Sequence, residues 1–299
     1  MPNEIVVLVN TAIVPIGLVA IMFSMGLSLA PADFREVARN PRAVFGGLGA
    51  QLVLLPPLAV LVAWVFRLPP AMATGLFILA ICPGGITSNA ITYAAKANVA
   101  LAVVLTTASS LVTVFTIPVL LNWALAHWFV AGEIPPLSVP RTMLQLAQMT
   151  LAPVALGMAI RAWRPATAAR MTVWLRPASL VVLIAVIAFS VAVSAELVLA
   201  NLVHAGPAAF VLNAASMALG VAIAVLLGLD RNDTLTVAIE VGIHNATMAT
   251  FLSLSVLKDI ALAITPTIYG VVMIVNAGLL VRLFRAFAAR RAQSAGATP

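Results

Sequence analysis

One carboxylate, Glu240, falls in the middle of a long apolar stretch of the sequence. A charge at such a depth is costly unless it is paired, protonated or bound to a cation, so Glu240 is a candidate functional residue. The alternative is a structural role, in which a protonated glutamic acid makes a hydrogen bond between helices. The other acidic residues are expected at span ends or in loops, in contact with solvent: Asp33, Glu133, Glu196, Asp230 and Asp233.

Neutral oxygen atoms could join this carboxylate from Ser88, Asn89 and Thr106. Sodium is a hard cation and, like calcium and magnesium, prefers oxygen ligands. One carboxylate with several neutral oxygens would therefore suit a monovalent cation. Ser88 and Asn89 could also cap a helix that restarts at their position, and capping does not exclude coordination.

Two segments predict that membrane helices are interrupted near these residues. Residues 82–89 (CPGGITSN) contain Pro83, which removes a backbone donor, and two glycines, which remove side-chain constraint. Residues 239–245 (IEVGIHN) place a glycine beside Glu240 at a similar depth. Paired broken helices are typical of the central site of secondary transporters, where a cavity satisfies the freed backbone groups. The N-termini of the restarted half-helices would favour an anionic substrate.

The composition predicts an all-α polytopic membrane protein, a single transmembrane domain of 299 residues. Apolar residues make up 63% of the chain and charged residues only 8%, too few to cover a soluble surface. The single cysteine, Cys82, excludes an intramolecular disulfide and is expected to be buried. Nine apolar blocks are long enough to cross a bilayer. They are residues 5–30, 43–66, 71–96, 99–124, 139–161, 171–195, 204–229, 233–257 and 260–286.

Basic residues collect at alternate connections between these spans. Of the 16 lysines and arginines, all but Arg67, Arg141 and Lys258 fall on one side of the nine-span arrangement. The positive-inside rule then predicts an external N-terminus and a cytoplasmic C-terminus, in a bacterial inner membrane. The net charge of +7 is spread over short groups, which argues against a nucleic-acid partner. The first block is expected to be a retained span and the tail 292–299 to be disordered.

A weak internal similarity predicts an inverted repeat. Residues 96–102 (KANVALA) after the first break are similar to residues 258–263 (KDIALA) after the second. The broken spans are the third and the eighth, so an odd number of spans separates them and the two halves run through the membrane in opposite senses.

The two break motifs resemble the crossing helices of the bile acid:sodium symporter family, and residues 22–34 resemble that family's early span and loop. The likeness covers residues 14–286 approximately. It implies a core domain of residues 43–124 and 204–286 that moves against a panel of residues 5–30, 139–161 and 171–195. It also implies sodium ions as co-transported ligands. The sequence gives no sign of an obligate protein partner.

The resemblance assigns sites residue by residue. The first sodium site would use Ser88, Asn89, Thr106 and Glu240, although a serine usual in the family is Ala102 here. The second site would use Gln51, Glu240, the carbonyl groups of Val241 and Ile243, and a glutamine side chain that is replaced by His244. Their positions beside the breaks also make Thr87 and Asn245 the expected contacts with the substrate. Asn276 could face the central cavity and join them, or it could make an interhelical hydrogen bond.

His244 is therefore expected to weaken the second site. An imidazole is a poorer ligand for a hard cation than an amide oxygen. A protonated imidazole would compete with sodium for Glu240, and an unperturbed histidine titrates at about pH 6.5. Acidification is thus expected to inhibit sodium binding, unless the imidazole merely packs in its neutral form.

Sodium-driven symport of an organic anion, either bile acid-like or a small carboxylate, is the leading functional interpretation. A second keeps the fold but couples transport to protons through Glu240 and His244, or to no ion. An intramembrane enzyme is disfavoured because the sequence lacks an H-E-x-x-H motif and a pair of buried aspartates. A membrane sensor that does not transport would leave the two broken helices unexplained.

Overall fold

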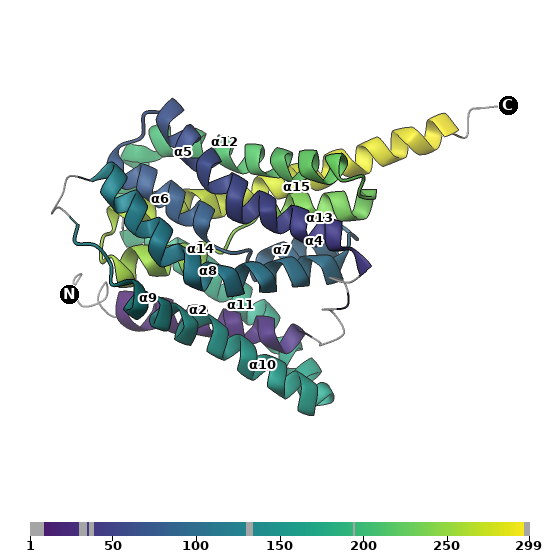
Figure 1. Cartoon of the computed structure of the whole chain (residues 1–299), viewed down its shortest axis with the longest axis horizontal. Helices are drawn as coiled ribbons and strands as arrows, with labels where there is room; N and C mark the ends of the chain where they lie inside the picture. Colours follow the sequence, from purple (N-terminus) through teal and green to yellow (C-terminus); the bar gives the residue numbers. More distant parts are fainter. Residues whose placement is uncertain (1–8, 30–34, 36–38, 130–133, 194, 296–299) are drawn as a thin grey trace.

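Helices joined by short connections make up most of the residues that the structure describes (Figure 1). In this computed structural model of the whole chain, the described residues are 9–29, 35, 39–129, 134–193 and 195–295. Within them, the β pairing is limited to one isolated antiparallel bridge, between Gly84 and His244. The prediction of an all-α protein is confirmed for this part of the chain.

The elements of the first half run from the first helix to the end of α8. Two π-helical turns, η1 and η2, are continuous with α-helices on their C-terminal sides, and the break between α6 and α7 interrupts one span. The bounds are η1 Val9–Ile13, α2 Val14–Ser28, α4 Pro41–Gly49, η2 Ala50–Leu54, α5 Leu55–Val65, α6 Pro70–Ile81, α7 Ile86–Ala94 and α8 Val99–Trp128.

The second half repeats this alternation of long and interrupted helices. A break separates α13 from α14, and α14 continues into the π-helical turn η4. The bounds are α9 Val139–Leu146, η3 Ala147–Leu151, α10 Ala152–Trp163, α11 Pro165–Val193, α12 Ala195–Leu226, α13 Arg231–Gly242, α14 Ala246–Phe251, η4 Leu252–Val256, η5 Ala261–Ala263 and α15 Ile264–Ala295.

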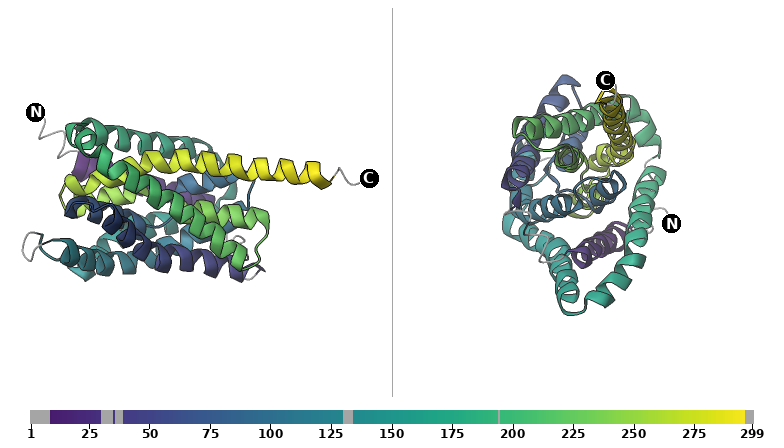
Figure 2. Two further views of the ribbon diagram at one scale, coloured as in Figure 1. Left: turned by 90° about the horizontal axis from the view of Figure 1, so that it is seen from above. Right: turned by 90° about the vertical axis from the view of Figure 1, so that its right-hand side faces the viewer.

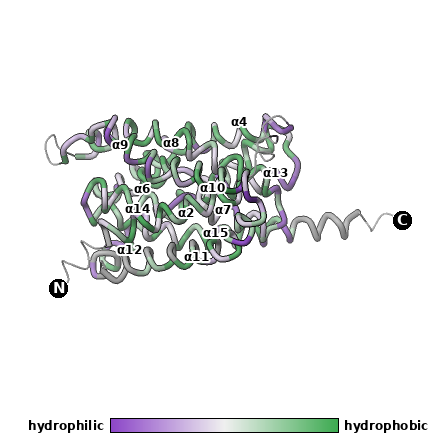
Figure 3. Tube along the Cα trace, turned by 90° about the horizontal axis from the view of Figure 1, so that it is seen from below, coloured by the Kyte–Doolittle hydropathy of each residue, from purple (hydrophilic) through white to green (hydrophobic). Residues whose placement is uncertain are grey.

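Six of the described helical stretches are long and apolar enough to cross a membrane. Shorter apolar helices cover residues 70–81 and 246–256, which are parts of the two interrupted spans. Apolar residues follow the length of the helices, while hydrophilic residues gather near helix ends (Figure 3). The long apolar stretches are Thr11–Ser28, Pro41–Val65, Val99–Trp128, Val139–Trp163, Leu199–Leu226 and Ala261–Ala286.

Several helix boundaries differ from the sequence prediction. Helix α12 begins at Ala195 rather than at residue 204, and α15 continues to Ala295. The prediction of a disordered tail is therefore wrong for residues 292–295, and residues 296–299 lie outside the described part. Residues 5–8 and 30 of the first predicted span also lie outside it. Hydropathy identifies the apolar part of a helix, whereas the helix itself continues past the membrane edge wherever propensity and packing allow.

Prolines explain three π-helical turns. The turns η1, η2 and η3 each end two residues before a proline, namely Pro15, Pro56 and Pro153. A proline ring clashes with the carbonyl group four residues earlier, and the wider π turn moves that carbonyl away. In η2 the amide of Leu55 accordingly bonds the carbonyl of Ala50, five residues back. This local widening sets the position of Gln51.

The helices form two groups. Helices α2, α10 and α11 lie together at one side of the molecule, apart from the larger group (Figure 2, right). Helices α2 and α10 approach closely because of Gly26 and Gly157. A Cβ at Gly26 would lie 2.2 Å from the Val154 carbonyl oxygen, and one at Gly157 would lie 2.6 Å from the Phe23 carbonyl oxygen. Backbone contact of this kind needs glycine at both positions.

Helix ends in the two halves share the same backbone geometry. Arg67 after α5 and Gly228 after α12 both have positive φ, 48° and 66°. Lys96 after α7 and Lys258 after η4 do as well, with φ of 59° and 57°. Each pair ends corresponding helices, by a turn in which the chain leaves the helix through a left-handed residue. These pairs support the predicted repeat, including the similarity between the segments that begin at Lys96 and Lys258.

Candidate functional site

The two breaks meet in the interior of the larger helix group. Helix α6 ends at Ile81 and α7 begins at Ile86, while α13 ends at Gly242 and α14 begins at Ala246. The intervening segments lie antiparallel, and the amide of Asn245 donates a hydrogen bond of 2.9 Å to the carbonyl oxygen of Pro83. Both predicted interruptions are confirmed, and the structure brings them into direct contact.

At this crossing, two backbone amides form hydrogen bonds with partners outside their own helix. In a continuous helix the Asn245 amide would bond the Val241 carbonyl, but it is used by Pro83 instead. The Gly84 amide similarly bonds Ser109 Oγ at 3.3 Å rather than the carbonyl of Ala80. Carbonyl oxygens near both breaks thus lose their usual helical donors and can face a ligand.

The Glu240 carboxylate lies at the crossing and is 1% exposed. Thr106 Oγ1 donates a hydrogen bond of 2.7 Å to Oε2, while Oε1 has no hydrogen-bond partner. Ser88 Oγ lies beside the same carboxylate and also 2.7 Å from the Gly85 carbonyl oxygen. Its single proton can serve only one of these two acceptors, so a cation between Ser88 and Glu240 would stabilise the cluster of oxygen atoms.

Asn89 adds a further unpaired oxygen atom in the first turn of α7. Its side chain is 7% exposed and its Oδ1 atom has no hydrogen-bond partner. The N-cap of α7 is Gly85, and no side chain caps this helix. Capping by Ser88 or Asn89, which the sequence allowed, is not observed. The residues thus fit a sodium ion, because they offer unsatisfied oxygen atoms beside a carboxylate.

Gly84 is required for this arrangement. A Cβ at Gly84 would lie 2.8 Å from Glu240 Oε2 and 3.3 Å from Thr106 Oγ1. Both distances are shorter than normal contacts, so a larger residue would displace the carboxylate or its donor.

The proposed second sodium site is less complete. Gln51, in η2, is 1% exposed and its Nε2 atom lacks a hydrogen-bond partner, and η2 packs against α13. His244 is also 1% exposed, with neither ring nitrogen hydrogen-bonded. Its ring stacks on Tyr269, with centroids 6.0 Å apart and an interplanar angle of 8°. Aromatic packing therefore fixes the imidazole of His244 beside Tyr269.

The three predicted substrate residues have different surroundings. Thr87 is 8% exposed in the first turn of α7. Asn245 caps α14, because its Oδ1 accepts a hydrogen bond of 2.9 Å from the Met248 amide, while its Nδ2 stays unpaired. Asn276 is buried on α15 with both polar side-chain atoms unpaired. It lies two turns after Tyr269 and so on the same face of the helix.

Two residues that the sequence analysis missed hold the second break in place. Asn213 Nδ2 and the Tyr269 hydroxyl donate hydrogen bonds of 2.7 and 3.0 Å to the carbonyl oxygen of Gly242. These bonds satisfy a carbonyl at the end of α13. A buried asparagine and tyrosine in apolar helices were the only available sequence signal, and it did not identify their partner.

The expectation that Asp233 contacts solvent is wrong. Asp233 is 6% exposed, and the side-chain amides of Asn98 and Asn40 both donate to its carboxylate, the former at 2.8 Å. This contact joins the starts of α4, α8 and α13. Asp230 does lie at a helix end, where it accepts a hydrogen bond from the Asp233 amide. Asp33 and Glu133 lie outside the described residues.

Over the described ranges, no three or more histidine, cysteine, aspartate or glutamate side chains gather as a metal-binding cluster. Cys82, beside the first break, is buried and free, as predicted. The polar groups at the crossing are instead one carboxylate, hydroxyl and amide oxygens, and backbone carbonyls. Such a set suits a hard monovalent cation better than a transition metal.

Comparison with known proteins agrees with this geometry. Residues 15–201 match the family model described as the sodium bile acid symporter family. The chain is 31% identical to the uncharacterized sodium-dependent transporter YocS of Bacillus subtilis, over 76% of this chain and 68% of the relative. It is 28% identical to the ileal sodium/bile acid cotransporter of Oryctolagus cuniculus, over 95% of this chain and 82% of the relative. It is 35% identical to the probable sodium/metabolite cotransporter BASS2 of rice, over 52% of this chain and 36% of the relative. The chain therefore belongs to the sodium bile acid symporter family, and it is a membrane transporter rather than an enzyme.

Proposed function

We propose that the protein is a secondary active transporter that couples the inward movement of sodium to the uptake of an organic anion. The observation that carries this proposal is the Glu240 carboxylate, which is buried at the crossing of two broken helices with Oε1 unpaired. A bound cation would neutralise this charge and provide the missing partner. The names of the relatives, a sodium-dependent transporter and a sodium/bile acid cotransporter, support sodium as that cation.

The first sodium ion is proposed to bind between α7, α8 and α13. The residues that would hold it share unpaired or suitably oriented oxygen atoms beside one carboxylate. They are Ser88, Asn89, Thr106 and Glu240.

A second sodium ion is proposed to bind weakly on the other side of Glu240. Gln51 and the carbonyl groups of Val241 and Ile243 would supply oxygen atoms, but His244 replaces the amide that the family pattern provides. The structure supports the weakness of this site, since the imidazole is packed against Tyr269.

The substrate is proposed to be a bile acid-like anion or a small carboxylate, bound where the half-helices restart. The N-termini of α7 and α14 carry the positive ends of helix dipoles, which favour an anion. Thr87 and Asn245 lie at these two ends, and Asn276 lies on the adjacent helix α15. Sodium bound to Glu240 would also reduce the repulsion between this carboxylate and the anion, which couples the two ligands electrostatically.

Alternating access is proposed to move the two helix groups relative to each other. The core would comprise α4–α8 and α12–α15, and the panel would comprise α2, α9, α10 and α11, as part of a nine-span arrangement. The close glycine contact between α2 and α10 supports a panel that moves as a unit. The distribution of arginines supports a cytoplasmic C-terminus in a bacterial inner membrane.

A ligand screen by thermal unfolding tests this proposal. The purified protein is heated with bile acids or small carboxylates, each with sodium or with choline as the cation. A ligand that binds the folded state raises the unfolding temperature by mass action. We expect sodium alone to stabilise the protein and to increase the effect of one anion class.

Thr106→Ser should keep this response and Thr106→Val should weaken it, since only serine can replace the hydrogen bond to Glu240. Equal stabilisation by sodium and choline would contradict the proposal, and stabilisation by acidic pH in place of sodium would favour proton coupling.

A further inference from the structure

A groove lies on the outside of the core, between α5 and α8. It consists of two adjoining cavities of about 820 Å³ and about 560 Å³, which share Pro57 and Val60 as lining residues. Helix α6 packs against both α5 and α8 and contributes Phe77 to the smaller cavity. Helix α6 therefore forms the base of the groove, and α5 and α8 form its sides.

The groove changes character along its length. The smaller cavity is lined by apolar and aromatic side chains, among them Leu52, Leu120 and Trp123. The larger cavity reaches the end of the bundle, where Arg67 and His127 line it and are both exposed. The groove is thus apolar along most of its length and has the charged side chain of Arg67 at one end.

An aromatic cluster fixes the wall of the groove. The rings of Phe77 and Trp123 have centroids 5.4 Å apart, and Trp123 stacks on His127 at 5.0 Å with an interplanar angle of 8°. Trp128 contacts both Phe77 and His127, at 5.5 and 5.3 Å. Such contacts make the wall a preformed surface, and tryptophan rings are typical of the headgroup level of a membrane.

We infer that this groove binds one anionic phospholipid, with its phosphate at Arg67 and an acyl chain along α5. From Leu52 to Trp64 the helix rises about 18 Å, close to the hydrocarbon depth of one leaflet, which is about 15 Å. Arg67 then lies just beyond Trp64, at the level of a phosphate. In the sequence, 13 of the 16 basic residues fall at connections on the opposite side of the predicted spans from Arg67, so the positive-inside rule does not account for Arg67.

This site goes beyond the transport function proposed above and does not depend on it. A phospholipid bound here would contact α5, α6 and α8 of the proposed core. Its phosphate group and long acyl chains also distinguish it from a small carboxylate substrate.

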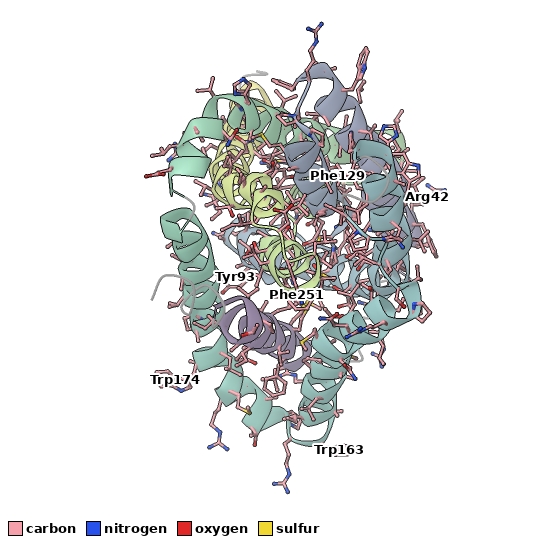
Figure 4. All side chains as sticks on the ribbon, turned by 90° about the vertical axis from the view of Figure 1, so that its left-hand side faces the viewer. Arg42, Tyr93, Phe129, Trp163, Trp174 and Phe251 are labelled. Atoms are coloured by element: carbon pink, nitrogen blue, oxygen red, sulfur yellow. The ribbon has the colours of Figure 1, made fainter. Side chains whose placement is uncertain are left out.

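The tryptophans of the groove provide a direct test. Trp163 and Trp174 project outward from another part of the molecule (Figure 4) and are replaced by phenylalanine, which leaves Trp64, Trp123 and Trp128 as reporters. The protein is placed in phosphatidylcholine vesicles that contain increasing amounts of phosphatidylglycerol with brominated acyl chains, which quench tryptophan. Brominated phosphatidylcholine in the same vesicles measures quenching by lipid without the anionic headgroup.

We expect phosphatidylglycerol to be preferred over phosphatidylcholine about fivefold, the effect of one basic side chain near an anionic lipid. Arg67→Gln should abolish this preference and Arg67→Lys should retain it. Arg141→Gln is the matched control, because Arg141 is also exposed, on α9, but does not line the groove. Val60→Phe, which narrows the point shared by both cavities, should reduce quenching by phosphatidylglycerol.

Three results would overturn the inference. The first is equal quenching by the two brominated lipids in the protein with Arg67 intact. The second is an equal loss of preference in Arg67→Gln and Arg141→Gln, which would indicate general surface charge. The third is a preference that excess inorganic phosphate removes, which would indicate a site for the free anion rather than for a lipid.

Discussion

The backbone amide of Asn245 donates a hydrogen bond of 2.9 Å to the carbonyl oxygen of Pro83. This bond joins the two interrupted helices at the points where each loses its own backbone hydrogen bonds. Because each break satisfies part of the other, neither half of the repeat can form the site alone. The backbone geometry at the crossing therefore sets where Glu240 and the surrounding oxygen atoms lie.

Gly84→Ala should disturb this crossing with little effect on the rest of the fold. The added Cβ would lie 2.8 Å from Glu240 Oε2. Relieving such a contact costs about 1–3 kcal/mol, so we expect sodium affinity to fall about tenfold. Gly278→Ala is the matched control, since its Cβ would meet nothing within 4 Å. The measurement is the half-saturating sodium concentration for uptake, determined for both variants. Equal values would show that the Glu240 carboxylate can be displaced without loss of sodium affinity.

His244→Gln should strengthen the second sodium site. Glutamine supplies an amide oxygen, a better ligand for a hard cation than an imidazole nitrogen. We expect a lower half-saturating sodium concentration and a steeper dependence of uptake on sodium. His127→Gln, at a histidine that stacks on Trp123 near the end of α8, serves as control. Unchanged sodium dependence in His244→Gln would mean that the second site does not operate in this chain.

Gly157→Ala should destabilise the contact between α2 and α10. The new Cβ would lie 2.6 Å from backbone atoms of Leu27 and Phe23, which cannot move as a side chain could. We expect a loss of about 1–3 kcal/mol of stability, seen as a lower unfolding temperature in detergent. Gly206→Ala, whose Cβ would lie 3.6 Å from the flexible Leu202 side chain, should be neutral or slightly stabilising. The same unfolding temperature for both variants would contradict the proposed rigidity of this helix pair.

Single cysteines test the proposed orientation. Cys82 is buried and should give little background labelling by a thiol reagent that cannot cross the membrane. A cysteine at Arg164, after α10, should react only from the cytoplasmic side, and one at Pro136, before α9, only from outside. Reaction of the Pro136 site from the cytoplasm would contradict the nine-span arrangement, because it would require the opposite orientation or a different number of spans.

The breaks could be predicted from the sequence because their cause is local. Pro83 and the glycines at 84, 85 and 242 act on their own backbone, and Glu240 is identified by its apolar surroundings. The partners across the crossing could not be predicted. Nothing near Pro83 in the sequence indicates that it accepts a bond from Asn245, because the contact depends on how two distant helices pack.

The error on Asp233 has the same origin. Asp233 lies at a helix end, as expected, but Asn40 and Asn98 come from other helices to cover it. Asn245 stays a predicted substrate ligand, and the structure adds its role as the cap of α14. The π turn that contains Gln51 follows from Pro56, and prolines inside apolar spans are a sequence signal that could have predicted it.

Glu240→Gln tests the central claim most directly. The amide keeps the shape of the side chain and can still accept the hydrogen bond from Thr106, but it removes the charge that would balance a bound cation. Uptake of the anion identified by thermal unfolding is measured in proteoliposomes with an inward sodium gradient, together with the unfolding temperature as a check on folding. The account predicts a folded protein in which the gradient no longer stimulates uptake. Sodium-stimulated uptake at the unmodified rate would contradict it.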